Sequence, residues 1–329
     1  MGIGSRVPRR AGVVRILIRM TIPLTGTQYV IEAGDYRATV TELGAGLRDL
    51  EHAGMPLVTT FDADQLPEHG AGQLLAPWPN RVDGGSYTFG ETEYQLALSE
   101  PARGNAIHGL TRWIPWTRVA HDRGEVTLRS VPHGQQGYPF AVQVDVTYRL
   151  NADSGLHVTV SAANKGSRPA PWGVGQHPYL TVATPTVDDC VLTLPADRWL
   201  PVDDRGIPAD APQDVAGSEF DFRTARKLGD TRLDHAFTGL CREADGLAWV
   251  RLEAGGLSSA LWADAGYRWL QVFTGDPLEP EFRRTALAVE PMTCPPNAFV
   301  SGEDLLVLQP KETVTCRWGI KNFSPNGAH

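Results

Sequence analysis

The stretch "AVQVDVTYRL" (residues 141–150) alternates apolar and polar side chains along most of its length. Val142, Val144, Val146, Tyr148 and Leu150 fall on one face, the period of two that is typical of a half-buried strand. The turn-rich "NADSG" (151–155) follows, and "LHVTVSAAN" (156–164) alternates again. The three stretches together predict an antiparallel hairpin.

Further strand signals lie on both sides of this hairpin, and helical periodicity over ten or more residues is almost absent. They are "SYTFGETEYQLAL" (86–98), which follows an Asp-Gly-Gly turn, "AWVRLEA" (248–254), "SALWAD" (259–264), "RWLQVFTGD" (268–276) and "TVTCRWGI" (313–320). No break in composition suggests two domains. The pattern predicts an all-β protein with one large antiparallel domain over residues 21–325, most simply a sandwich. Proline-rich loops such as 199–217 are expected to lie over its surface.

Length, charge and cysteine content restrict the class of protein. The chain has 329 residues and a formal net charge of −8, which argues against nucleic acid as a partner, because that ligand needs clustered Lys and Arg. No apolar run approaches the ~18 residues of a membrane span. Four widely spaced cysteines form no C-x-x-C pair, so we expect a reducing, cytoplasmic setting. Residues 1–20 contain five arginines and no acid, and we expect a disordered extension rather than a signal peptide.

Four loops collect polar groups that can do chemistry. "APWPNRVDGG" (76–85) presents Asn80 and Arg81 on a backbone stiffened by two prolines. "NAIHGL" (105–110) presents His108, and "GVGQHPYL" (173–180) presents His177 before a proline. A lone histidine in such a loop is more often an ordinary hydrogen-bonded residue than a catalyst.

The fourth loop, "LAVEPMTCPPNAF" (287–299), carries a glutamate after an apolar run. Because a proline follows Glu290, we expect this residue at the end of a strand. The apolar residues 287–289 beside it are expected to desolvate its carboxylate partly, which would raise its pKa toward the range of a general base. A salt-bridged residue at a strand end is the alternative. Metal binding by His108 and His177 stays open, although the spacing suggests no third ligand.

The order of these stretches resembles that of the aldose 1-epimerase (galactose mutarotase) family. The matching stretches span roughly residues 30 to 320 and are "PWPNRVDGGSYTFG", "NAIHGL", "GVGQHPYL", "LDHAFTGL" (233–240), "LQVFTGD" (270–276) and "AVEPMTCPPNAF" (288–299). The resemblance implies a large antiparallel β-supersandwich and a cofactor-independent isomerase that interconverts the α and β anomers of an aldose. It implies neither a metal nor an organic cofactor. The expected partner is a small sugar, with the protein a monomer or a homodimer.

The resemblance also implies the site residues. His177 would be the general acid and Glu290 the general base. Sugar hydroxyls or the ring oxygen would contact Asn80, Arg81, His108, Asp234 and Gln271. From its position in the chain, Trp172 is expected to offer a stacking face to the sugar. The chemistry suits these residue types, because ring opening needs one proton removed from the C1 hydroxyl and another delivered to the ring oxygen.

Two departures leave the sugar open. The chain has His177–Pro178–Tyr179–Leu180 and Pro291–Met292–Thr293, forms more similar to the bacterial branch that includes sulfoquinovose mutarotases. A sulfonated or phosphorylated sugar would need an additional cation, and the sequence does not place one. The alternatives are a phosphosugar or sulfosugar 1-epimerase, a non-catalytic carbohydrate-binding protein, and a glycoside hydrolase using Glu290 and Asp234.

Overall fold

Antiparallel strands make up nearly all of the regular secondary structure in the described part of the chain. The computed structural model describes residues 22–131 and 133–323, so the extension predicted for residues 1–20 lies outside the described part. Helix in this part is limited to α1 (Ala298–Ser301) and two 3-10 turns, η1 (Glu68–Gly70) and η2 (Val187–Asp189). Every pairing between named strands is antiparallel, which confirms the predicted fold class.

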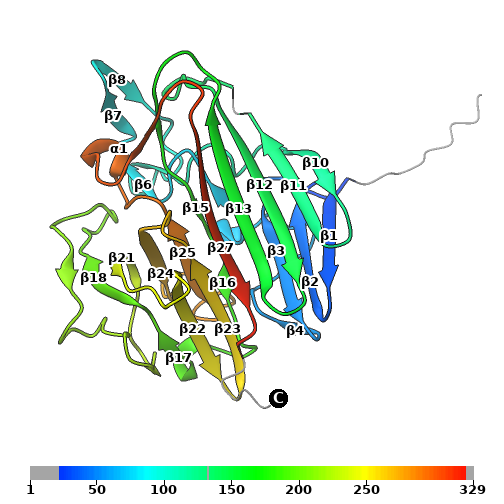
Figure 1. Cartoon of the computed structure of the whole chain (residues 1–329). Coiled ribbons are helices and arrows are strands. Elements are labelled where there is room, and N and C mark those ends of the chain that lie inside the picture. Colours follow the sequence, from blue (N-terminus) through cyan, green and yellow to red (C-terminus); the bar gives the residue numbers. More distant parts are fainter. Residues whose placement is uncertain (1–21, 132, 324–329) are drawn as a thin grey trace, which may run out of the picture.

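The predicted hairpin over residues 141–164 lies in the middle of a nine-stranded sheet (Figure 1). Its inward-facing Val144, Val146 and Tyr148 are fully buried, as the alternation requires. In spatial order the strands are β10 (Thr117–His121), β11 (Glu125–Ser130), β12 (Val142–Asn151), β13 (Gly155–Asn164), β27 (Thr313–Lys321), β23 (Leu257–Ala263), β22 (Ala248–Ala254), β17 (Val191–Thr193) and β20 (Arg226–Lys227).

The second large sheet has eight strands and carries most of the residues of interest. Its order is β19 (Gln213–Asp214), β18 (Ala196–Leu200), β21 (Asp234–Leu240), β24 (Trp269–Phe273), β25 (Leu287–Met292), β15 (Gly175–Gln176) and β5 (Leu74–Leu75), and β16 (Tyr179–Leu180) also pairs with β25. One cluster of buried side chains draws on residues from Tyr29 to Ile320. The two large sheets therefore share a core.

Four smaller sheets complete the fold. A four-stranded sheet of β1 (Gln28–Ala33), β2 (Tyr36–Thr41), β3 (Leu47–His52) and β4 (Met55–Pro56) packs against β11 and β12 (Figure 1). The two-stranded pairs are β6 (Arg81–Asp83) with β9 (Asn105–Ile107), β7 (Ser86–Phe89) with β8 (Thr92–Gln95), and β14 (Ala170–Trp172) with β26 (Leu306–Leu308). The pair β7–β8 is the hairpin predicted over residues 86–98.

A buried hydrogen-bond chain joins the central hairpin to the second sheet. Tyr148 on β12 donates its hydroxyl proton to the carbonyl of Ala45 at 2.5 Å, and Gln176 donates from Nε2 to the Tyr148 oxygen at 2.5 Å. Gln176 directly precedes His177, so the core of the first sheet fixes the backbone beside a predicted site residue. No helix in the described ranges is long and apolar enough to cross a membrane.

Candidate active site

Strand register places Glu290 between two of its predicted partners. On one side, β24 pairs with β25 so that Gln271 lies opposite Glu290. On the other side, Gly175 pairs with Met292 and Tyr179 with Ala288, and the same register carried through the gap between β15 and β16 sets His177 opposite Glu290. Directly opposite residues in antiparallel strands point to the same face. The three side chains therefore converge.

The imidazole of His177 and the carboxyl of Glu290 are in direct contact. His177 Nε2 lies 3.1 Å from Glu290 Oε1, and both side chains are almost fully buried. Glu290 is the fourth of six residues in β25, so the prediction that it lies at a strand end was wrong. Pro291 stays within the strand, opposite Leu270 of β24, and the strand continues past it.

Burial favours the uncharged form of each partner. It raises the pKa of Glu290 well above its ordinary value, and the nearby charge of Asp234 adds to the effect while that of Arg81 opposes it. The expected rise in this pKa is thus confirmed. Burial also lowers the pKa of His177 to about 3. Both shifts favour a protonated carboxyl beside a neutral imidazole. His177 Nδ1 and Glu290 Oε2 have no partner among the described residues.

Asp234 and Gln271 extend the site across two more strands. Ala236 of β21 lies opposite Gln271 of β24. Asp234 precedes Ala236 by two positions, so its side chain points to the same face as that of Gln271. Gln271 donates from Nε2 to Asp234 Oδ1 at 2.8 Å. The Gln271 amide is thereby oriented, and its buried Oε1 is left without a partner in the described chain.

Asn80 and His108 lie in two loops that bond to each other. Both residues have a left-handed backbone, with φ of 54° and 61°. The backbone N–H of His108 donates to the carbonyl of Asn80 at 2.8 Å, and the N–H of Asn80 donates to His108 Nδ1 at 3.2 Å. Because Nδ1 accepts, the neutral ring carries its hydrogen on Nε2 and can donate to a ligand oxygen.

This tautomer bears on the one group of possible metal ligands found among residues 22–131 and 133–323. Donor atoms of His108, His177 and Glu290 lie within 4.8 Å of one another, which supplies the third ligand that the sequence did not suggest. A metal-binding histidine usually donates its second N–H to an acceptor, whereas His108 receives a hydrogen bond there. The set fits a ligand with hydroxyl groups better than a cation.

Arg81 is held by Glu100, a residue that the sequence did not single out. Its Nε and Nη2 donate to the two carboxylate oxygens of Glu100 at 2.8 and 3.0 Å. Burial opposes the charge of Arg81, but the bonds to Glu100 outweigh it, so the pKa of Arg81 is raised. The guanidinium is thus fixed before any ligand arrives. No local pattern marks Glu100, because it meets Arg81 only in the folded chain, where Glu100 bridges to Asn105 of β9 and β9 pairs with β6.

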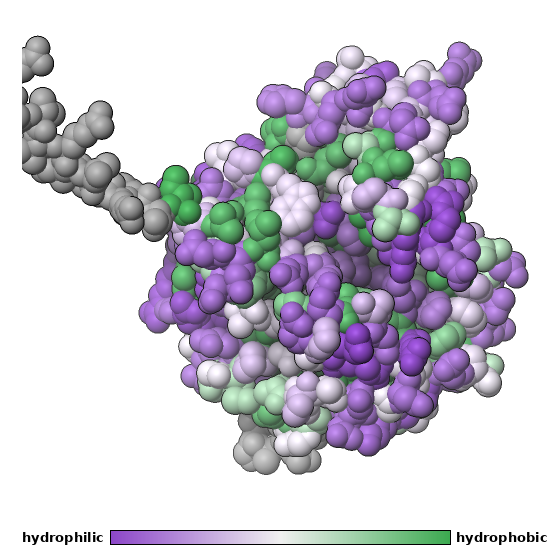
Figure 2. All heavy atoms as spheres, turned by 180° about the vertical axis from the view of Figure 1, so that it is seen from behind, coloured by the Kyte–Doolittle hydropathy of each residue, from purple (hydrophilic) through white to green (hydrophobic). Residues whose placement is uncertain are grey.

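Seven of the eight predicted site residues line one cleft of about 300 Å³, a size common for small-molecule sites. The face shown in Figure 2 is hollowed near its middle, with hydrophilic residues around the hollow. Residues lining the cleft that the sequence did not identify include His69, Glu100, Arg103, Arg112, Tyr179 and Phe273. Tyr179 stacks on His177, with 5.0 Å between ring centroids.

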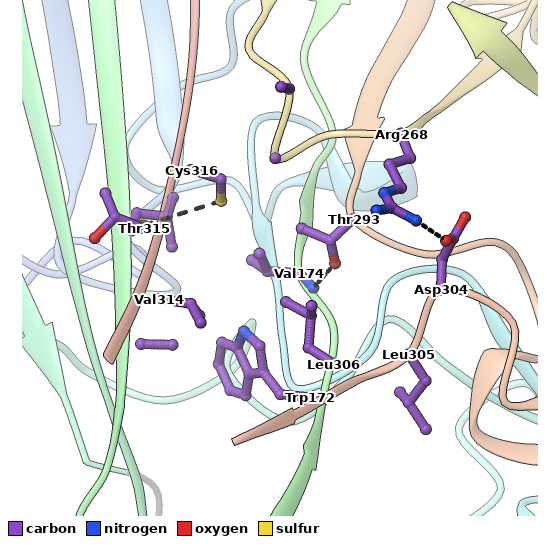
Figure 3. Close-up of a pocket in the computed structure, with 14 residues that line it drawn as sticks. Trp172, Val174, Arg268, Thr293, Asp304, Leu305, Leu306, Val314, Thr315 and Cys316 are labelled. Carbon is purple, nitrogen blue, oxygen red and sulfur yellow. Dashed lines mark hydrogen bonds and ion pairs between the residues drawn. The ribbon is translucent and has the colours of Figure 1, made fainter. Parts of the chain in front are cut away.

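Trp172 is the exception, and its predicted stacking role was wrong. The side chain is 1% exposed and lines a separate cavity of about 340 Å³ beside Val174, Thr293 and Leu306 (Figure 3). Trp172 and His177 are an odd number of positions apart in the sequence. In an extended chain, the side chains of two such residues point to opposite faces. The sugar cleft lies on the face of His177.

Gly109 is required for the loop that carries His108. Its φ is +70°, and an added Cβ would lie 2.0 Å from the carbonyl oxygen of Ala76. We expect Gly109→Ala to lower the free energy of unfolding by about 3 kcal/mol or more, because strain and a backbone clash add. Gly54→Ala is the matched control, since its φ is +76° with nothing within 4 Å, and should cost about 1 kcal/mol. Equal losses in urea unfolding would contradict the clash.

Comparison with known proteins identifies the family. The aldose 1-epimerase family model matches residues 27–321. The chain is 38% identical over 288 residues to Escherichia coli YihR, an uncharacterized protein, covering 87% of this chain and 90% of that one. It is 29% identical over 233 residues to galactose mutarotase of Sus scrofa, covering 67% and 66% of the two chains.

Solved structures agree on the fold. A GalM/aldose epimerase homologue from C. elegans superposes with a TM-score of 0.82 at 20% identity, covering 91% of this chain and 99% of that chain. Galactose 1-epimerase from Lactobacillus acidophilus gives 0.74 at 21% identity, covering 88% and 92%. The antiparallel sheets are therefore the galactose mutarotase-like β-supersandwich. With the family model matched over nearly all of the described residues, the chain belongs to the aldose 1-epimerase family and is an isomerase that interconverts the anomers of an aldose.

Proposed function

We propose that His177 and Glu290 are the acid and base of this mutarotase. The observation that carries the proposal is their 3.1 Å contact inside a cleft lined by hydroxyl-binding groups. A proton moves from Glu290 to His177 as the sugar enters, which leaves a carboxylate to accept the C1 hydroxyl proton. The imidazolium delivers its proton to the ring oxygen, and the C1–O5 bond opens to the free aldehyde. Rotation about C1–C2 and reclosure with the transfers reversed gives the other anomer.

Other cleft residues supply binding and charge stabilisation. Arg81 and the Nε2–H of His108 are donors for an oxygen on which negative charge develops. Asp234 and the Oε1 of Gln271 are acceptors for sugar hydroxyls, which orients the ring. These groups need no metal or organic cofactor to complete the reaction. We propose that residues 21–325 form one catalytic domain that acts as a monomer or homodimer. The four cysteines are free thiols, which supports a cytoplasmic setting.

The pH dependence of the reaction tests the acid–base pair. The active form holds one proton between the two residues. The pKa of His177 is lowered to about 3, so the pair takes up a second proton only in strong acid. The pKa of Glu290 is raised, so the pair loses its remaining proton only above the range in which an ordinary glutamate titrates. We expect catalysed exchange at roughly pH 5 to stay within about twofold of that at pH 7. Saturation-transfer NMR, corrected for the uncatalysed rate, measures it. An acid limb centred near 6.5, the ordinary pKa of histidine, would contradict the assignment.

A further inference from the structure

The cavity beside Trp172, here called the Trp172 cavity, is separate from the sugar cleft (Figure 3). Its volume is about 340 Å³, and it shares no lining residue with the cleft in the part of the chain that the structure describes. Residues of β13 and β27 in the nine-stranded sheet form one side, and residues of β14 and β26 form another. This volume exceeds the water-sized voids of a packed interior and lies in the range of small-molecule sites.

Most of the wall of the Trp172 cavity is apolar. Its aliphatic members are Val160, Ala162, Val174, Leu305, Leu306 and Val314. The two charged residues of the wall, Arg268 and Asp304, form an ion pair with each other. Asp304 also accepts a hydrogen bond from Trp269 Nε1 at 2.8 Å. Because the charges compensate each other and the rest of the wall is apolar, the cavity favours an uncharged ligand.

One buried donor belongs to this wall and lacks an acceptor. Trp172 is 1% exposed, and its Nε1 has no hydrogen-bond partner among residues 22–131 and 133–323. In Figure 3 the indole nitrogen lies at the edge of the ring that is turned toward the middle of the lining residues. A buried N–H without an acceptor is unfavourable, so an acceptor atom on a ligand would be stabilising at this position.

The other polar side chains of the wall do not favour water as that acceptor. Buried water typically makes about three hydrogen bonds to polar groups that are otherwise unsatisfied. The wall has two hydroxyl groups, and both are engaged. Thr293 Oγ1 accepts from the N–H of Val174 at 2.9 Å, and Thr315 Oγ1 lies 2.9 Å from Ser161 Oγ. An apolar molecule with a single acceptor matches the Trp172 cavity better than water does.

We infer that the Trp172 cavity is a second ligand site, which takes a neutral, ring-shaped molecule whose carbonyl or ether oxygen accepts the Trp172 Nε1–H. The ring of such a molecule buries its surface against the aliphatic wall, and its oxygen satisfies the indole donor. The inference does not depend on the roles proposed for His177 and Glu290, because neither residue lines this cavity.

The site lies behind the two segments that carry the acid–base pair. Val174 and Thr293 bond to each other through the Thr293 N–H and the Val174 carbonyl at 2.9 Å. Val174 precedes His177 by three positions, and Thr293 follows Glu290 by three. Residues an odd number of positions apart in extended chain point to opposite faces. A ligand in the Trp172 cavity therefore binds beside the catalytic segments without entering the sugar cleft.

An NMR titration of the tryptophan indoles tests the site. The chain has nine tryptophans, and the indole N–H signal that is missing in Trp172→Phe identifies Trp172. Acetophenone, a neutral ring with one carbonyl, should shift this signal saturably with a Kd on the order of 1 mM. Benzoate has the same ring but a full charge, and should bind at least about tenfold more weakly. A Trp172 signal that acetophenone does not shift, or equal binding of benzoate, would overturn the inference.

Variants assign the binding to the Trp172 cavity. Trp172→Phe removes the donor and should weaken acetophenone binding by about 5- to 10-fold, followed on the backbone amide signals. Trp113→Phe is the matched control, since it removes an exposed indole outside the wall, and should leave the Kd unchanged. Val314→Phe adds bulk at a half-buried position of the wall and should also weaken binding. An unchanged Kd in Val314→Phe and Trp172→Phe would show that acetophenone binds elsewhere.

Kinetics separate this site from the sugar cleft. With an aldose that the protein turns over, such as glucose, KM should stay within about twofold as acetophenone is added. A KM that rises in proportion to the acetophenone concentration would place the probe in the cleft and overturn the inference. The proposed function is tested by replacing Glu290 or His177, and those results are independent of acetophenone binding to the wild type.

Discussion

Glu290→Gln is expected to lower kcat for anomer exchange by about 10³- to 10⁴-fold, with little change in KM. The glutamine amide fills the same space but cannot accept the C1 hydroxyl proton, and a positioned base contributes up to this amount. Binding depends mainly on Arg81, His108, Asp234 and Gln271, which keep their side chains. The loss should therefore fall on the chemical step.

The fold of this variant should be intact or slightly more stable. Glu290 is 2% exposed, and burial favours the uncharged form of its carboxyl. Replacing it with a neutral group of the same shape should therefore cost little stability. We expect an unchanged or higher Tm and exchange rates near the uncatalysed value for every sugar. Wild-type kcat in a folded Glu290→Gln protein would show that another group is the base.

His177→Asn is expected to lower kcat by about 10²- to 10³-fold. Asparagine does not reach the position of Nε2, so the ring oxygen must take its proton from water. The effect is smaller than for Glu290→Gln because water can replace an acid more readily than a desolvated base. Since the two residues act as a pair, the double variant should be barely slower than Glu290→Gln alone.

The stability and the turnover of a second variant, His177→Gln, separate the acid role of His177 from a packing role. The ring stacks on Tyr179 at 5.0 Å and meets His108 edge-on at 5.4 Å, so some stability is lost with it. His177→Gln returns an amide nitrogen near the former Nε2 and should restore packing but not activity. Recovery of turnover in the glutamine variant would mean that His177 only fills space.

Much of the fold follows from local pattern. The alternation over residues 141–150 predicts a strand with Tyr148 inward, because a side-chain period of two is a property of the extended backbone itself. The same reasoning finds the hairpin over residues 86–98. The desolvation of Glu290 is also predictable, since burial is favourable for an apolar run such as residues 287–289 beside it.

Three features of the site could not be predicted in this way. Proline after Glu290 suggested the end of a strand, yet β25 continues because its neighbours supply pairing around Pro291. Trp172 lies near His177 in the chain but on the opposite face. Arg112 shows no local signal, yet the fold places it in the cleft with His108 and His177.

The sequence by itself thus determined the strand class, the family and the set of polar side chains available for chemistry, because these depend on local composition and order. Only the tertiary structure decided which of them meet. The contact of His177 with Glu290 depends on the register of strands more than one hundred residues apart, and register is set by the packing of whole sheets. The bond of Arg81 to Glu100 depends on that same packing, since Glu100 bridges to Asn105 of β9, the strand that pairs with β6.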